Sequence, residues 1–218
     1  SCIVLVGISY FILDILSGIV IVPKTDVEEV FGEGELLIPL DEAEIRSLKV
    51  SGDGSYLAFI AERSSSRNVA LRVFELEGGP REVHTQDIEG SELAWLGYTQ
   101  SLLFEDSGDI FLLDLAQGSS DNLTASSAYD SDPLPSPDGR FILWTVTAEE
   151  TEGEGPGFWV MADDGSGKAF LAEKQNLAVW DPAGGMIISL RDGAGTGGEA
   201  AYSFQLQTAA IGGSPVGS

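Results

Sequence analysis

The chain of 218 residues carries 35 acidic and 11 basic side chains, for a formal net charge of −24. This charge excludes nucleic acid and anionic lipid as natural partners and favours cationic proteins or divalent ions, although adaptation to a salty milieu would also explain it. With 43% apolar residues the chain can bury a core. The single cysteine, Cys2, excludes an internal disulfide, and the single histidine, His84, disfavours most hydrolytic mechanisms.

The first predicted element is a transmembrane helix over residues 3–22, within a domain at 1–24. Twenty mostly apolar residues with one charge rise about 30 Å as a helix, which matches a bilayer core. The alternative is a buried pair of strands, since β-branched residues are plentiful, but no Pro, Asn or Asp-Gly turn divides the segment. A cleaved export signal fits less well, because the apolar run is longer than usual for one. Cys2 is then interpreted as an ordinary residue at the membrane end, with acylation as the alternative.

Small and polar residues fall on one face of this helix, and we expect them to pack on a partner: Gly7, Tyr10, Asp14, Ser17 and Gly18. A carboxylate near mid-span costs about 2.5–3.5 kcal/mol, so Asp14 should face protein or water rather than lipid. The helix is therefore predicted to dock in a membrane complex. A solitary, protonated Asp14 is the alternative.

Residues 25–42 form an acidic linker with a possible ring-closing strand. Lys24 is the only basic residue close to the exit of the helix, so the positive-inside rule weakly predicts a C-terminal domain on the extracytoplasmic (periplasmic) side. Residues 34–40, "GELLIPL", are suited to the outer strand of a last blade, where they would join the ends of a ring.

Residues 43–218 contain a repeat. Four segments share a polar turn and a following apolar strand: "VSGDGSYLAFIAE" (50–62), "WLGYTQSLLFEDS" (95–107), "PSPDGRFILWTVT" (135–147) and "WDPAGGMIISLRD" (180–192). The turn position falls at residues 54, 99, 139 and 184, which are 45, 40 and 45 residues apart. A fixed period in this range indicates a propeller or solenoid. The second half of each unit adds a strand, a glycine-bearing turn and a short strand.

Two stretches, "LTASSAYDSDPLPSPDGRFILWTV" and "FWVMADDGSGKAFL", resemble the repeat of TolB-type, WD40-like β-propellers. The resemblance is specific over residues 122–171, good over 51–83 and weak in the other two units, where Thr99 and "DPAGG" depart from the pattern. It implies an all-β fold: a β-propeller of about four blades of four-stranded antiparallel sheets, preceded by the transmembrane α-helix. Because family members commonly have six or more blades, either four blades close the ring, or the chain is truncated, or a partner completes it.

Several motifs are predicted to be structural. The chain lacks the G-x-S-x-G elbow and the catalytic triad of a serine hydrolase. The stretch "ADDGSGKA" (162–169) lacks the first glycine and the final hydroxyl of a phosphate loop, so it is predicted to be a blade turn rather than a phosphate or Ca²⁺ site. The glycosylation pattern at Asn122 coincides with the family's leucine-threonine strand and is interpreted as coincidence. The four tryptophans are assigned to core packing. We expect no enzyme activity, cofactor or metal.

The run "AEETEGEGPG" (148–157) interrupts the third unit between two strands and carries four carboxylates: Glu149, Glu150, Glu152 and Glu154. It is either a solvated hairpin tip or a contact for a basic partner, whose association clustered carboxylates would accelerate.

The sequence thus predicts a non-catalytic, membrane-anchored, extracytoplasmic propeller. It would act through protein–protein contacts as an accessory or scaffolding subunit of a respiratory, photosynthetic, secretion or envelope complex, with a cationic protein among its partners. The alternative is a solute-binding or enzymatic propeller with a ligand at the central channel, where convergent charged side chains would favour chemistry and apolar ones scaffolding.

Overall fold

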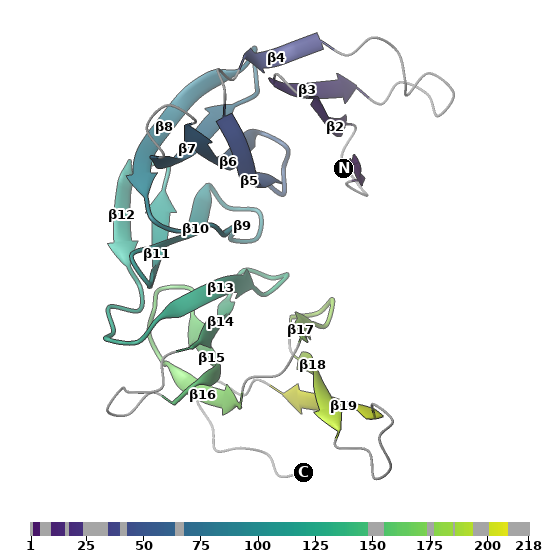
Figure 1. Cartoon of the computed structure of the whole chain (residues 1–218), viewed down its shortest axis with the longest axis vertical. Coiled ribbons are helices and arrows are strands. Elements are labelled where there is room, and N and C mark those ends of the chain that lie inside the picture. Colours follow the sequence, from purple (N-terminus) through teal and green to yellow (C-terminus); the bar gives the residue numbers. More distant parts are fainter. Residues whose placement is uncertain are drawn as a thin grey trace. The chain divides into compact units, whose positions relative to one another are not determined.

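The computed structural model describes residues 2–4, 10–15, 18–23, 35–39, 43–63, 68–147, 155–173, 177–184, 186–193 and 201–208. Within these ranges the chain is all β, with 19 strands in five sheets (Figure 1). The chain divides into two compact units, residues 1–87 and 88–218. Every sheet keeps its strands in chain order, which is how consecutive hairpins build a propeller blade.

The N-terminal segment forms strands where the sequence predicts a helix. Its strands are β1 (Cys2–Val4), β2 (Tyr10–Ile15), β3 (Gly18–Pro23) and β4 (Glu35–Pro39). β2 pairs antiparallel with β3 from Tyr10↔Pro23 to Ile15↔Gly18. The described residues of this segment therefore form strands rather than the predicted helix, as in the strand-pair alternative. Among those residues no helix is long and apolar enough to cross a membrane.

β4 lies within the segment that the sequence predicts to close the ring, and ring closure itself stays a prediction. It pairs with β3, from Gly18↔Pro39 to Ile21↔Glu35, and is the last strand of the sheet β1-β2-β3-β4. The strand within residues 34–40 is therefore real, but its edge is occupied by the segment that the sequence assigned to the membrane. Because residues 18–23 form the strand β3, the edge of β3 is the nearest one along the chain with which β4 can pair.

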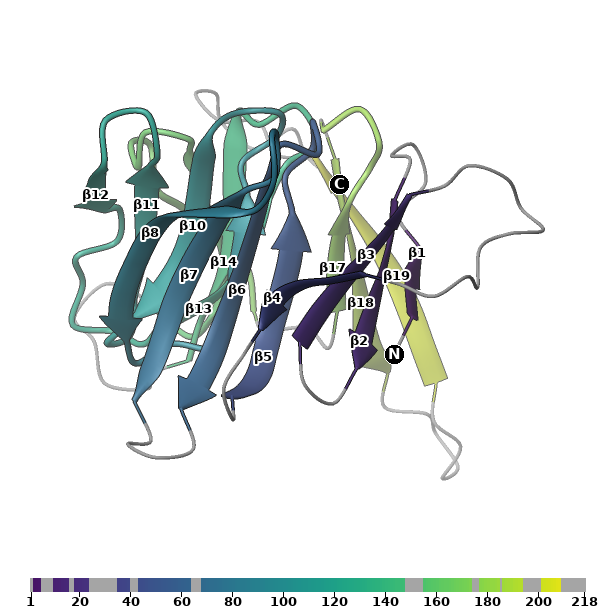
Figure 2. The same cartoon turned by 90° about the horizontal axis from the view of Figure 1, so that it is seen from above.

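The first repeat forms a complete four-stranded sheet: β5 (Ala43–Val50), β6 (Tyr56–Arg63), β7 (Val69–Glu75) and β8 (Arg81–Ile88). Figure 2 shows these strands side by side in chain order. Leu57, Phe59 and Ala61 alternate along β6 and form one core cluster with Phe74 of β7. Arg72 lies over the rings of Phe59 and Phe74 and is bonded to Glu82, so a charge caps this apolar face.

The second unit holds three sheets. Two have four strands: β9 (Leu93–Trp95), β10 (Ser101–Asp106), β11 (Asp109–Asp114) and β12 (Ser119–Asn122), then β13 (Asp130–Pro135), β14 (Phe141–Val146), β15 (Gly157–Ala162) and β16 (Ala169–Ala172). The third has three strands among its described residues: β17 (Leu177–Trp180), β18 (Met186–Gly193) and β19 (Ala201–Thr208). Four-stranded antiparallel sheets, as the repeat predicts, are confirmed.

β14 shows how the sheets stack within this unit. Ile142, Trp144 and Val146 join the core cluster shared with Leu103 and Ile110 of the preceding sheet. Leu143 points the other way, into a cluster with Ile187 of the following sheet. Alternate side chains of one strand leave opposite faces, so a strand buried on both faces is largely apolar, as "FILWTV" is apart from Thr145.

Candidate functional site

In two of the four repeats, the turn between the first two strands is built by a serine and an aspartate. In the copy after β13, Ser136 Oγ accepts the N–H of Phe141 at 3.0 Å and donates to Asp138 Oδ1 at 2.7 Å. In the copy after β5, Ser51 Oγ accepts the N–H of Tyr56 at 2.9 Å and donates to Asp53 Oδ1 at 2.7 Å. The two copies thus share one hydrogen-bond network.

The two divergent copies keep the turn but change its cap. All four turn positions donate their N–H to the carbonyl three residues earlier, which confirms the predicted repeat register: Gly54, Thr99, Gly139 and Gly184. In the second copy Thr99 Oγ1 bonds the carbonyl of Leu96 at 2.6 Å and accepts the N–H of Ser101 at 3.2 Å. In the last copy Asp181 Oδ2 accepts the N–H of Ala183.

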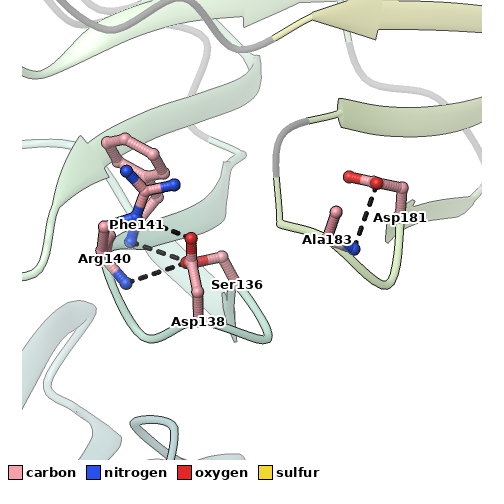
Figure 3. Close-up of polar contacts among 6 residues, drawn as sticks. All are labelled: Ser136, Asp138, Arg140, Phe141, Asp181 and Ala183. Atoms are coloured by element: carbon pink, nitrogen blue, oxygen red, sulfur yellow. Dashed lines mark hydrogen bonds and ion pairs between the residues drawn. The ribbon is translucent and has the colours of Figure 1, made fainter.

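The three turns of the second unit are neighbours. A Cβ on Gly97 would lie 3.3 Å from the Cα of Gly139, and one on Gly184 would lie 2.9 Å from Cγ of Asp138. Figure 3 shows the Ser136–Phe141 turn beside the turn that carries Asp181 and Ala183. The indole of Trp180 also donates to the carbonyl of Leu134 at 2.9 Å, which ties β17 to β13.

The carboxylates of these turns are held by hydrogen bonds from side chains and backbone N–H groups of the same turn. Partial burial raises the pKa of Asp138, but hydrogen bonds from Ser136 and Arg140 outweigh it, so that pKa lies below its ordinary value. The pKa of Asp53 is also lowered, chiefly by the Ser51 hydroxyl and then by the N–H of Ser55. Both are therefore ionised turn caps. Their oxygens serve the fold, which argues against a role as acid or base.

The serine of the turn provides a first test of repeat equivalence. We expect Ser51→Ala and Ser136→Ala each to lower the free energy of unfolding by about 1–2 kcal/mol, because each leaves a buried N–H without its acceptor. Urea unfolding followed by circular dichroism measures both losses, since all four tryptophans lie in the second unit and Ser51 in the first. Values that differ by more than about 1 kcal/mol would contradict equivalent roles for the two hydroxyls.

Three exposed apolar side chains lie on the first strands and turns of the second unit. Tyr98 is 79% exposed, Val179 43% and Leu134 36%, and these are three of the five large apolar side chains exposed in the described residues. Tyr98 occupies the position of Asp53 and Asp138. Since Thr99 caps this copy of the turn, position 98 is free of the structural role that aspartate has elsewhere.

A second polar network joins the two four-stranded sheets of this unit. Thr124 Oγ1 accepts the N–H of Ile110 at 3.0 Å and donates to Asp109 Oδ1 at 3.1 Å. The amide of Asn122 donates to Asp109 Oδ2 at 2.8 Å, while its oxygen accepts two backbone N–H groups. Because Thr124 is buried and the Asn122 amide is bonded, the glycosylation pattern is a structural junction, which agrees with the interpretation as coincidence.

The stretch "ADDGSGKA" is a turn between β15 and β16. The N–H of Ala162 bonds the carbonyl of Ser166, and the N–H of Ser166 bonds Asp164. Lys168 Nζ donates to the carbonyl of Thr124 at 2.6 Å, so its ammonium fastens the turn to the sheet junction. The prediction of a blade turn is confirmed. No group of three or more potential metal ligands occurs among the described residues.

The remaining site predictions are placed as follows. Tyr10 and Asp14 lie in β2 and Gly18 begins β3, so they do not share a helix face, while Gly7 and Ser17 lie outside the described residues. The acidic-loop residues Glu149, Glu150, Glu152 and Glu154 also lie outside them, and their role stays a prediction. Core packing of tryptophan is confirmed for Trp95, Trp144 and Trp159, which are buried.

His84, the single histidine, lies within β8 and is half-buried, with Nε2 lacking a hydrogen-bond partner among the described residues. Burial lowers its pKa and a hydrogen bond with the side chain of Gln86 raises it, with a lower value as the net result. The imidazole is therefore neutral at neutral pH.

No family model and no curated protein sequence matches the chain. Several solved structures are similar to the chain. An oligogalacturonate lyase, solved with manganese, matches 86% of this chain with TM-score 0.64 and 11% identity, over 56% of its own length. TolB from Agrobacterium tumefaciens matches 92% with TM-score 0.56 and 18% identity, over 73% of its length. Puromycin hydrolase matches 95% with TM-score 0.65 and 12% identity, over 35% of its length.

The chain has a β-propeller fold. Its repeated four-stranded sheets and these neighbours agree, and the resemblance to TolB-type repeats is confirmed at the level of fold. The chain spans little more than half of the lyase and about a third of puromycin hydrolase. The neighbours include enzymes as well as TolB, so the propeller fold is compatible with catalysis and with binding.

Proposed function

We propose that the chain is a non-catalytic propeller domain that binds a basic protein partner as an accessory or scaffolding subunit. The observation that carries the proposal is the group of exposed apolar side chains on the first strands and turns of the second unit: Tyr98, Leu134 and Val179. Exposed aromatic and aliphatic side chains on rigid turns are typical anchors for a protein partner. The neighbouring carboxylate of Asp138 is engaged as a turn cap, which supports binding over acid–base chemistry.

Charge supports a basic partner. The excess of 35 acidic over 11 basic residues would accelerate association with a cationic protein and penalise acidic ones. The setting in a membrane complex and the extracytoplasmic location remain predictions. They no longer rest on a helix over residues 3–22, because β2 and β3 occupy much of that range.

Capture from an extract of the source organism tests the proposal. We expect the purified chain to retain a stoichiometric partner in low salt, and Tyr98→Ala with Leu134→Ser to weaken that retention at least tenfold, as for anchor residues. Phe170→Ala is the matched control, since Phe170 is an exposed aromatic on the last strand of its sheet. A partner retained equally by all variants, or insensitive to salt, would contradict the proposed surface or its basic partner.

A further inference from the structure

Glu105 is a buried carboxylate at the joint between two sheets. It is the penultimate residue of β10 and only 5% exposed. Its Oε1 accepts the N–H of Asp132, on the first strand of the next sheet, at 2.6 Å. Its Oε2 faces the N–H of Ser91, in the segment before β9, at 3.5 Å. One side chain thus connects β10 to β13 and to the entry of its own sheet.

The bond from Asp132 maintains an irregular stretch of β13. The pairing of β13 with β14 shifts register between Ser131 and Leu134, and Asp132 has φ +54°. A left-handed backbone at a non-glycine residue costs about 1–2 kcal/mol and persists only where neighbours hold it. The carboxylate of Glu105 provides that hold, because it satisfies the N–H that the bulge turns away from β14.

The surroundings of Glu105 are uniformly acidic. Burial raises the pKa of Glu105, the N–H groups of Asp132 and Ser91 lower it, and the charges of Asp132 and Glu92 raise it further, so that its pKa lies above the ordinary value. Strands β9, β10, β11 and β13 and residues 89–92 contain no Lys, Arg or His. Their other charged residues are Glu89, Glu92, Asp106, Asp109, Asp114, Asp130 and Asp132.

We propose that Glu105 is a pH-sensitive latch, which holds β13 against β10 more tightly in mild acid than at neutral pH. When the latch opens, the carboxyl enters water and its pKa returns to the ordinary value of 4.5. The closed joint therefore binds more protons than the open one between the ordinary and the raised pKa. The free energy needed to open the joint is therefore largest below the ordinary pKa, and it decreases as the pH rises from the ordinary to the raised pKa of Glu105.

The latch goes beyond the proposed partner binding and does not depend on it. It controls the strand that exposes Leu134, so a partner at this surface would meet a more ordered β13 in mild acid. This pH dependence of stability is opposite to that of His84. Because the pKa of His84 is lowered in the folded chain, its contribution to stability decreases as the pH falls below 6.5. The two groups are in different units and can be separated by local measurements.

Amide hydrogen exchange of the full chain between pH 4 and 7.5 tests the latch. We expect the protection factor of the Asp132 amide to fall with rising pH, by up to about tenfold per pH unit within the window. Glu105→Gln keeps an acceptor for this N–H but cannot ionise, so its profile should be flat. The Ser136 amide, bonded to Phe141 O just after the other end of β13, is the internal control and should show no such fall.

Two results would overturn the latch: a flat profile for Asp132 in the unchanged chain, or the same slope in Glu105→Gln. If that variant does not fold, the carboxyl carbon of Glu105 can be titrated by NMR in the unchanged chain. A midpoint at or below 4.5 would refute the proposal, because ionisation would then favour the closed joint.

Discussion

Gly90→Ala is expected to lower the free energy of unfolding by about 3 kcal/mol or more. A Cβ at residue 90 would lie 2.1 Å from the carbonyl oxygen of Glu105 and 2.5 Å from its Cβ. These atoms cannot move cheaply, because the N–H of Glu105 is bonded to the carbonyl of Glu92 and its carboxylate to Asp132. The added methyl group should force residues 89–92 away from β10. Urea unfolding followed by tryptophan fluorescence measures the loss.

Gly118→Ala is the matched control for this contact. Gly118 has φ +66° and nothing within 4 Å of an added Cβ, so alanine there meets only the cost of a left-handed backbone, about 1–2 kcal/mol. Gly90→Ala instead introduces the close contact with Glu105. The difference between the two losses of unfolding free energy therefore measures the cost of that contact. A loss at Gly90 no larger than that at Gly118 would show that residues 89–92 do not pack against β10 as described.

The turn chemistry of the repeat is predictable from sequence because it is local. Ser136, Asp138 and Gly139 satisfy one another within six residues, and the same spacing at Ser51 forms the same bonds. Even Thr99 could be placed, since the period fixed its position. Exposure of Tyr98 could have been suspected from the loss of aspartate at that position in the repeat.

The N-terminal segment shows where local patterns are ambiguous. A run of about twenty apolar residues satisfies a membrane helix by length and a strand pair by its β-branched content. Ser17-Gly18 is a turn signal, and β3 begins at Gly18. That dipeptide and the high content of isoleucine and valine are the sequence features that favour a hairpin over a helix.

The buried carboxylates could not be predicted, because their partners are distant in sequence. Glu105 meets an N–H 27 residues away, and Asp130 meets an indole N–H 14 residues away. In the sequence each carboxylate resembles any solvated acid, in a chain that has 35 of them. Only the stacking of sheets distinguishes the few that are buried and bonded from the many that are exposed.

Asp130→Ala is expected to cost about 3–4 kcal/mol of unfolding free energy, for reasons that these distant contacts supply. Asp130 is 1% exposed. Its Oδ1 accepts the indole N–H of Trp144 at 2.8 Å, and its Oδ2 accepts the hydroxyl of Ser126 at 2.9 Å. Alanine would leave the buried indole N–H of Trp144 and the partly buried hydroxyl of Ser126 without this acceptor, at about 1–3 kcal/mol each. Denaturant unfolding measures the total.

Asp130→Asn separates geometry from charge. Its oxygen can still accept from Trp144, and its amide can donate to the Ser126 oxygen, so we expect a loss of about 1 kcal/mol or less. Trp144→Phe removes the indole donor, and in that background Asp130→Ala should cost at least about 1 kcal/mol less, because one orphaned group is gone. Equal losses for alanine and asparagine would show that the negative charge is essential. Additive losses for Asp130→Ala and Trp144→Phe would show that the carboxylate does not stabilise the core through Trp144.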